Sequence, residues 1–214
     1  MRQIAERKPR ILEAETGVFD IAILGGGIHG ACASRDAALR GYRVVLFDAK
    51  DYAFGTSSRS SKLLHGGVRY LEQLEFDLLF TSLHERARVL NQAPHLARPL
   101  PKFFPILPGM TRPAWQVRIG LAVYDGLARI FAPENAGRFP VSRRIKNATP
   151  ESEKLRAMGL KFSSLIQYYD GQVDDTRVVI ENIVDANELG AVTLNYAKVD
   201  RCQRTSGDIA RWCV

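Results

Sequence analysis

The sequence predicts an α/β fold, in which helices cover both faces of a mostly parallel sheet. Residues 19–48 have the order strand, glycine-rich turn, helix, strand. Residues 44–47 form a continuous apolar run, which is typical of a parallel strand covered on both faces. A second helix and strand follow within residues 174–199. With 214 residues, of which 46% are hydrophobic, the chain can form one large domain or two small ones.

The turn carries Gly25, Gly27 and Gly30 at the spacing G-x-G-x-x-G. This spacing gives a tight turn, close approach of a phosphate to the backbone, and room for a helix against the strand. The helix then points free amide groups at an anion, and Gly41 is typical of its C-terminal end. Asp48 follows Gly30 by 18 residues, near the spacing at which a carboxylate binds the adenosine ribose hydroxyls. The pattern predicts a dinucleotide site, and the acid disfavours the 2′-phosphate of NADP.

The net charge of +7 arises mainly from residues 112–161, where ten Lys or Arg face four Asp or Glu. Such a patch attracts phosphates, anionic lipid or nucleic acid, or it is an ordinary solvated surface. Because no nucleic-acid motif accompanies it, we predict no nucleic-acid partner. Residues 1–18 are charged and aperiodic, which predicts a loosely ordered tail.

The three cysteines, Cys32, Cys202 and Cys213, are far apart and lack metal-ligand spacing. They predict reduced thiols in the cytoplasm rather than disulfides or zinc. His84 and Glu85 do not form H-E-x-x-H, because residue 88 is Arg, so we expect no metal site. The N-terminus lacks the apolar core of a secretion signal. Since no run approaches the roughly 20 apolar residues that cross a bilayer, any membrane contact is expected to be peripheral.

A second informative stretch follows Asp48 and is dense in hydroxyls and small residues. Its hydroxyl residues are Thr56, Ser57, Ser58, Ser60 and Ser61. An isolated serine run usually indicates a surface loop with helix caps. Here Lys62 and a glycine pair, Gly66 and Gly67, come next, and hydroxyls with a lysine can satisfy diphosphate or ribityl oxygens. Glycines let the backbone approach a flat ring.

The middle of the chain alternates helical and proline-rich segments. Apolar spacing predicts a helix from about Glu72 to just before Pro94. Six of the ten prolines fall between Pro94 and Pro113, which predicts extended edges or loops, such as residues 102–107. Residues 115–131 return to helical spacing. The residues predicted to face inward are Trp115, Ile119, Val123, Leu127 and Ile130. Their basic neighbours Arg112, Arg118 and Arg129 leave docking on a membrane surface open.

Residues 132–161 are predicted to form loops with short helices, because three prolines interrupt them. Residues 162–173 are predicted to be two strands that meet at an Asp170-Gly171 turn. Asp174 or Asp175 can cap a helix that ends before Gly190. Residues 191–199 are predicted to be a strand, and residues 205–208 a turn into a partner strand. So few parallel strands predict a fragment of a larger sheet.

The pattern predicts four segments. Residues 1–18 are the tail, residues 19–93 the first part of a cofactor-binding domain, residues 94–173 a substrate or cap segment, and residues 174–214 the second, incomplete part of the cofactor-binding domain.

Several blocks together resemble the FAD-dependent glycerol-3-phosphate dehydrogenases, flavoproteins of the D-amino-acid-oxidase-like fold class. The blocks are GGGIHG, GTSSRSSKLLHGGVRYLE, APHLARPLP, RPAWQVRIGLAVYDGLAR and VDDTRVVIENI. The resemblance runs from about Phe19 to Val199 and is most specific in TSSRSSKLLHGGVRYLE. It implies a Rossmann-like FAD-binding domain with part of an α+β substrate domain, truncated at its C-terminal side.

The resemblance implies oxidation of sn-glycerol 3-phosphate at C2 to dihydroxyacetone phosphate, with FAD as cofactor and electrons passed to quinone. The catalytic base is expected beyond Val214, so His65 is not assigned that role and no catalytic residue is named. Arg69 and Tyr70 are predicted to bind the substrate phosphate, because a guanidinium makes paired hydrogen bonds to phosphate oxygens. The predicted FAD-binding residues are Gly25, Gly26, Gly27, His29, Gly30, Asp48, Ala49, Thr56, Ser57, Ser60, Ser61, Lys62, His65 and Val199.

Two alternatives stay open at this point. One is a related flavin oxidase that acts on an amine or a hydroxy acid, and the other is a truncated, non-catalytic nucleotide-binding module. The expected location is the cytoplasm, with peripheral contact at the inner face of the cytoplasmic membrane. The sequence leaves homo-oligomerisation open.

Overall fold

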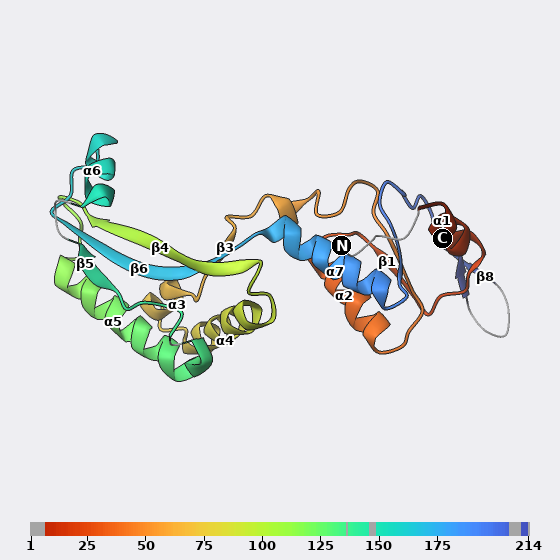
Figure 1. The fold of residues 1–214 in the computed structure, drawn as a ribbon, viewed down its shortest axis with the longest axis horizontal. Coiled ribbons are helices and arrows are strands. Elements are labelled where there is room, and N and C mark those ends of the chain that lie inside the picture. The colour runs from red at the N-terminus through yellow and green to blue at the C-terminus, as the bar shows by residue number, and fades with distance from the viewer. Residues whose placement is uncertain (1–6, 136, 146–148, 206–210, 214) are drawn as a thin grey trace. The chain divides into compact units, whose positions relative to one another are not determined.

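The computed structural model describes residues 7–135, 137–145, 149–205 and 211–213 (Figure 1). They form two compact units: unit 1 runs up to Ser61 and resumes at Asp174, and unit 2 is Lys62–Val173. Packing thus divides the chain after residues 61 and 173, whereas the predicted segments divide after residues 18, 93 and 173. What each predicted segment does stays a prediction.

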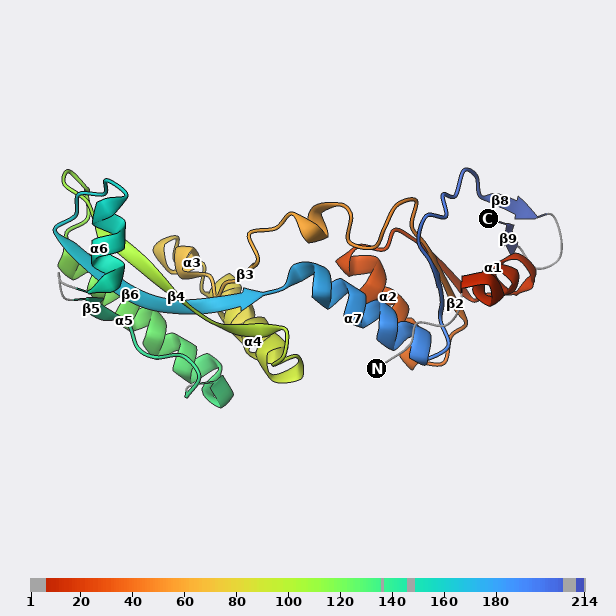
Figure 2. The same cartoon turned by 45° about the horizontal axis from the view of Figure 1, so that its top comes forward.

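Unit 1 is built on a three-stranded parallel sheet in the order β1-β2-β7. Strands β8 and β9 form a small antiparallel pair (Figure 2). Its elements are α1 (Arg7–Thr16), β1 (Ile21–Leu24), α2 (Ile28–Leu39), β2 (Val44–Phe47), η1 (Thr56–Ser58), α7 (Asp175–Glu188), β7 (Val192–Leu194), β8 (Gln203–Thr205) and β9 (Arg211–Cys213).

Strand β2 is buried on both faces, which explains its continuous apolar run. Leu46 packs in the cluster formed with α2 and α7, and Val44 packs beside it against α2 and the end of α7. Val45 points to the opposite face, where it meets Val192 and Leu194 of β7. The predicted strand, helix and strand of residues 19–48 are therefore confirmed.

The predicted loosely ordered tail is wrong for residues 7–16, which form α1. Ile11 and Ala14 pack onto the Val45 face of the sheet, so α1 covers the face that α2 and α7 leave open. Two guanidinium N–H groups of Arg7 donate to Asn195, one to Oδ1 and one to the carbonyl oxygen, both at 2.7 Å. The sequence did not predict this helix because most of its residues are polar or charged. A helix that covers a small sheet needs only a narrow apolar stripe.

Helix α7 agrees with the prediction, since the Asp174 carboxylate accepts a hydrogen bond from the Arg177 amide at 3.1 Å and caps the helix. The strand predicted over residues 191–199 is shorter and ends at Leu194. Tyr196 has a left-handed φ of 51°, and its amide donates to the Lys50 carbonyl oxygen, so the chain turns away from the sheet. Of the predicted turn at residues 205–208, residues 206–208 lie outside the described residues.

Unit 2 is an antiparallel sheet packed against helices. Strand β6 pairs with β4 along one side and with the short strands β3 and β5 along the other. The elements of unit 2 are β3 (Leu63–Leu64), α3 (Val68–Glu72), α4 (Phe76–Gln92), β4 (Ala97–Ile106), α5 (Ala114–Phe131), η2 (Pro133–Asn135), β5 (Arg143–Ile145), α6 (Pro150–Ala157) and β6 (Ser164–Val173).

Strand β4 is an edge, as the prolines predicted. Pro99, Pro101 and Pro105 occupy alternate positions, and in an antiparallel pair alternate residues direct their N–H groups away from the partner. The missing amide hydrogens therefore fall on the unpaired side. The predicted turn at Asp170-Gly171 is wrong, because both residues lie within β6 and pair with β4. Asp170 is buried, which a hairpin tip would not allow.

Helix α5 exists as predicted, but its predicted inward face is wrong except for Leu127, which packs against the buried cluster that contains Tyr124. Trp115, Ile119 and Ile130 are 61%, 56% and 70% exposed. The buried residues are Leu121 and Tyr124 instead. Among the described residues, no helix is both long and apolar enough to traverse a lipid bilayer.

Candidate functional site

The glycine turn of unit 1 joins β1 to α2 at the carboxyl end of the strand. The amide of Gly25 donates to the carbonyl oxygen of Phe47 at 2.8 Å, which holds the turn at the end of β2. A Cβ at position 30 would overlap the carbonyl oxygen of Gly25. Only glycine at position 30 therefore lets the helix approach the strand this closely.

The first turn of α2 offers an anion site. The amides of Ile28, His29 and Gly30 precede the first intrahelical hydrogen bond, which the Ala31 amide makes to Gly27. The Ile28 amide donates to Ser57 Oγ at 3.0 Å. A hydroxyl thus lies where a phosphate oxygen would accept the same hydrogen bond.

Asp48 points its carboxylate at the glycine turn. Its Oδ2 accepts a hydrogen bond from the Gly26 amide at 2.6 Å, and its Oδ1 accepts one from the Lys50 amide at 2.8 Å. A carboxylate has about four acceptor positions, so about two remain for hydroxyl donors. Asp48 therefore fixes the turn and can also bind a sugar diol.

Tyr52 and Ala53 also fix this turn, and sequence reasoning missed both. The Ala53 amide donates to the Gly26 carbonyl oxygen at 2.9 Å, and Ala53 is buried with a left-handed φ of 61°. A Cβ at position 26 would lie 2.6 Å from the Tyr52 ring. The Tyr52 hydroxyl donates to Thr193 Oγ1 at 3.0 Å, and burial raises its pKa. The one sequence signal was an aromatic residue close behind Asp48.

The remaining predicted residues of unit 1 surround this turn in part. Val199 lines a groove of about 620 Å³ with Phe47 and residues 197–201, beyond the carboxyl end of β2. Ligands of open α/β sheets bind in such positions. The Ser60 hydroxyl donates to Asp175 at the start of α7 at 2.7 Å. Ala49, Thr56 and Ser61 are exposed.

In unit 2 the predicted residues lie on the segment from β3 to α3. Lys62 has a left-handed φ of 55°, and its carbonyl oxygen accepts from the Val173 amide. His65 and Tyr70 are ring neighbours, with centroids 6.4 Å apart and planes at 62°. Arg69 is exposed, and no carboxylate pairs with it among the described residues. The structure thus brings the rings of His65 and Tyr70 close together, and the exposed Arg69 precedes Tyr70 on the same short segment.

Comparison with known proteins decides the family. The family described as FAD dependent oxidoreductase matches residues 20–213, which is nearly the whole chain. The chain belongs to this family. FAD, the predicted cofactor, is confirmed as the cofactor of the family, and the predicted fold is confirmed with it.

Individual relatives narrow the comparison. The chain is 42% identical over 195 residues to a D-erythritol 1-phosphate dehydrogenase of Brucella abortus, covering 91% of this chain and 37% of that protein. It is 36% identical over 201 residues to a glycerol-3-phosphate dehydrogenase of Synechocystis sp., covering 92% and 35%. The chain therefore spans somewhat over a third of the length of these relatives.

A solved structure extends the comparison to three dimensions. The glycerol-3-phosphate dehydrogenase from Bacillus halodurans, complexed with FAD, superposes with a TM-score of 0.56 at 28% identity, covering 95% of this chain and 31% of that one. The predicted resemblance to glycerol-3-phosphate dehydrogenases is confirmed.

The residues of unit 1 fit a flavin dinucleotide. The first amides of α2, of which Ile28 donates to the replaceable Ser57 hydroxyl, suit its diphosphate. The glycine turn leaves room for close approach, and Asp48 retains acceptor positions beside it. The individual roles of these residues, and of Arg69 and Tyr70, stay predictions.

Proposed function

We propose that this chain carries the FAD-binding and substrate-phosphate-binding residues of a dehydrogenase that oxidises sn-glycerol 3-phosphate to dihydroxyacetone phosphate. The observation that carries the proposal is the match to several glycerol-3-phosphate dehydrogenases, two of which are 36% and 39% identical over about nine tenths of this chain. The substrate-binding part rests on Arg69, which is exposed and has no carboxylate partner among the described residues.

The chain's own residues would hold the cofactor at the glycine turn. The amides of Ile28, His29 and Gly30 bind the diphosphate, and Asp48 accepts hydrogen bonds from the ribose hydroxyls. Ser57 exchanges its hydrogen bond with the Ile28 amide for one to the phosphate. Bound FAD supplies the hydride acceptor for oxidation of a secondary alcohol.

Arg69 and Tyr70 can bind the substrate phosphate through their charge and geometry. Arg69 presents a planar fork of N–H donors that matches two phosphate oxygens, and Tyr70 adds a hydroxyl. Fixing the phosphate places the neighbouring carbinol carbon, which lowers the entropic part of the barrier.

The test is an absorbance spectrum of the purified protein, with and without glycerol 3-phosphate. We expect yellow protein whose visible flavin band bleaches when the substrate reduces it. An Arg69→Ala variant should keep the colour and lose bleaching at low substrate concentration, because only phosphate binding is weakened. Yellow protein that does not bind glycerol 3-phosphate would count against the substrate. Yellow protein that binds it without bleaching, or colourless protein, would favour a non-catalytic module.

A second candidate substrate is another polyol phosphate, because the 42% identical relative is named a D-erythritol 1-phosphate dehydrogenase. Both compounds carry a phosphate ester on a short polyol, so Arg69 and Tyr70 serve either. Parallel bleaching titrations with the two compounds separate them, because the true substrate should reduce the flavin at a lower concentration. An amine or hydroxy-acid oxidase would instead be reduced by substrates without phosphate, and Arg69→Ala would not affect it.

We also propose that electrons pass to quinone at a membrane surface that α5 contacts. Trp115, Ile119 and Ile130 form an exposed apolar stripe on this helix, and Arg118 and Arg129 are exposed beside it. An amphipathic helix with basic flanks binds anionic lipid in this manner.

A further inference from the structure

A buried carboxylate in unit 2 brings β6, α4 and β4 together around one loop. Asp170 of β6 is 1% exposed. Its Oδ1 accepts hydrogen bonds from the Gly66 amide at 2.8 Å, from Arg86 Nη1 of α4 at 3.0 Å and from the Gly171 amide at 3.1 Å. Lys102 of β4 lies with its Nζ 3.6 Å from Oδ2. The loop of residues 65–67 is therefore fastened by its backbone to a charged centre.

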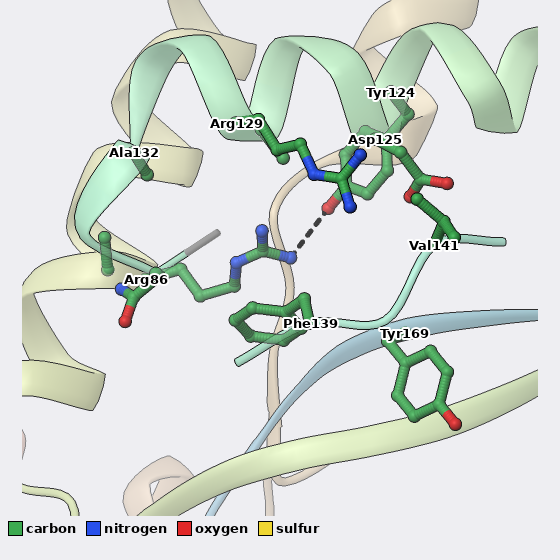
Figure 3. A pocket seen from close by; sticks show the side chains of 11 residues that line it. Arg86, Tyr124, Asp125, Arg129, Ala132, Phe139, Val141 and Tyr169 are labelled. Atoms are coloured by element: carbon green, nitrogen blue, oxygen red, sulfur yellow. Dashed lines mark hydrogen bonds between the residues drawn. The ribbon is translucent and has the colours of Figure 1, made fainter. Parts of the chain in front are cut away.

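The guanidinium of Arg86, which pairs with Asp170, is also held by several contacts. The side chain of Arg86 is 4% exposed, and its Nη1 also donates to the Tyr124 hydroxyl of α5 at 3.0 Å. Its guanidinium lies 4.3 Å from the centroid of the Phe139 ring (Figure 3). Figure 3 shows Arg86 extended between Phe139 and Tyr124. Arg86 thus has one fixed position from which to hold Asp170.

The loop of residues 65–67 packs closely against the Arg86–Asp170 pair. A Cβ at position 66 would overlap the Tyr124 hydroxyl and would lie 2.7 Å from Leu83 Cδ2 and 2.8 Å from Arg86 Nη1. Only glycine fits there. Strand β3 pairs with β6 immediately before the loop, and α3 begins immediately after it. The backbone between β3 and α3 therefore has little freedom.

Stability alone does not account for this arrangement. Removing two charges from water is costly, and well-packed apolar residues in the place of a buried ion pair are often at least as stabilising. What apolar residues cannot supply is an acceptor for the Gly66 amide. That amide belongs to the segment that carries His65, Arg69 and Tyr70.

We propose that Asp170, held in place by Arg86, is a positioning residue that fixes the His65–Gly66–Gly67 backbone and thereby sets the placement of Arg69 for a substrate phosphate. The inference rests on the proposed function, since that function assigns the phosphate to Arg69. Asp170 acts through the loop and does not touch the substrate.

Two charge-neutral double variants of the full chain, loaded with FAD, test the role. Arg86→Met with Asp170→Asn removes both charges and keeps an acceptor for the Gly66 amide. Arg86→Met with Asp170→Ala removes both charges and the acceptor. The two proteins differ at one side chain, so an unpaired buried charge cannot explain a difference between them. Glu85→Gln, which removes an exposed carboxylate paired with Arg88 on α4, is the control.

Two measurements read the effect: the dissociation constant of glycerol 3-phosphate by calorimetry, and amide hydrogen exchange of the peptide that covers residues 65–70. We expect the control to match the unchanged protein, and the Asn variant, which keeps the acceptor but lacks Arg86, to bind glycerol 3-phosphate more tightly than the Ala variant. The Ala variant should bind glycerol 3-phosphate at least about tenfold more weakly, because small misplacements of a binding group are costly, and should exchange this peptide faster than the rest of unit 2.

Equal affinities in the Asn and Ala variants, with the unchanged protein binding normally, would overturn the positioning role and leave the proposed function standing. Uniformly faster exchange across unit 2 in the Ala variant would also overturn it, because that result indicates a general loss of stability. No binding of glycerol 3-phosphate by the unchanged protein would overturn the proposed function and this inference with it.

Discussion

Asp48 shows how one side chain serves both the fold and a ligand. It was predicted as a ribose-binding acid, and in the structure its two oxygens already accept from the amides of Gly26 and Lys50. The carboxylate is thus aimed at the turn by the backbone it stabilises. Sequence spacing predicted the residue, but its hydrogen bonds to the turn could be found only from the folded backbone.

Replacing Asp48 with Ala should weaken FAD binding by about tenfold to a hundredfold, because hydrogen bonds to a charged acceptor contribute about 1.5–3 kcal/mol. Fluorescence titration of the apoprotein with FAD measures the change. Asp36→Ala is the matched control, because Asp36 is an exposed carboxylate on α2 whose partner is Arg40. Equal FAD affinities of the two variants would contradict the role of Asp48.

Tyr124 makes a pH-dependent contribution to stability. Burial, with the negative charge of Asp170 next, raises the pKa of this hydroxyl above its ordinary value. In the unfolded chain a tyrosine loses its proton near pH 10. Above that pH the unfolded state binds fewer protons than the folded state, so the free energy of unfolding should fall as pH rises.

Urea unfolding from pH 8 to 11 checks this sign. The unchanged protein should lose up to about 1.4 kcal/mol per pH unit more than Tyr124→Phe once the pH exceeds about 10. Below pH 9 the difference between the two proteins should be constant. Parallel curves over the whole range would show that Tyr124 does not titrate differently in the two states.

At the level of elements, periodicity predicted the helices but not always their orientation. Helix α5 has two stripes at helical spacing, and the predicted one, with Trp115 and Ile119, faces outward. The stripe with Leu121 and Tyr124 is buried, because Leu121 packs against β4 and β6 and the Tyr124 hydroxyl accepts a hydrogen bond from Arg86. When a helix is apolar on two sides, its sequence alone does not show which side is buried.

The orientation of α5 predicts a contrast between neighbouring residues. Leu121→Ala should destabilise the protein by about 2–5 kcal/mol, because it leaves a cavity in the core. Ile119→Ala, a similar truncation of an exposed side chain, should change stability by no more than about 0.5 kcal/mol. Chemical denaturation of both variants measures the contrast. A larger loss for Ile119→Ala would restore the face that the sequence predicted.

Strand β6 shows the opposite limit of sequence reasoning. Asp170-Gly171 has the composition of a hairpin turn, and turn chemistry is a local signal. Here the aspartate is buried within a strand by Arg86 and Lys102, which come from distant parts of the chain. Arg86 and Lys102 approach Asp170 only in the folded protein, so no local sequence pattern could have predicted a strand here instead of a turn.

For the whole molecule, the exposed apolar stripe of α5 and the basic charge of residues 112–161 both predict binding to an anionic membrane surface. The protein should sediment with vesicles of anionic phospholipid at low salt and be released as salt rises. Ile119→Glu should reduce binding by about tenfold, since it places a charge in the apolar stripe. Leu39→Glu, at an exposed apolar position on α2, is the control and should bind like the unchanged protein. Equal loss in both would indicate a non-specific charge effect.

The chain by itself determined the strand, turn, helix and strand around the glycines, the capped helix after Asp174 and the edge character of the proline-rich strand. Each of these follows from short-range rules on φ, hydrogen-bond donors and apolar spacing. Only the tertiary structure decided that residues 7–16 cover the sheet, which stripe of α5 is buried, and that Asp170 fastens the loop before Arg69. These depend on contacts between residues far apart in the chain, where the free energy of burial and of charge pairing overrides local preference.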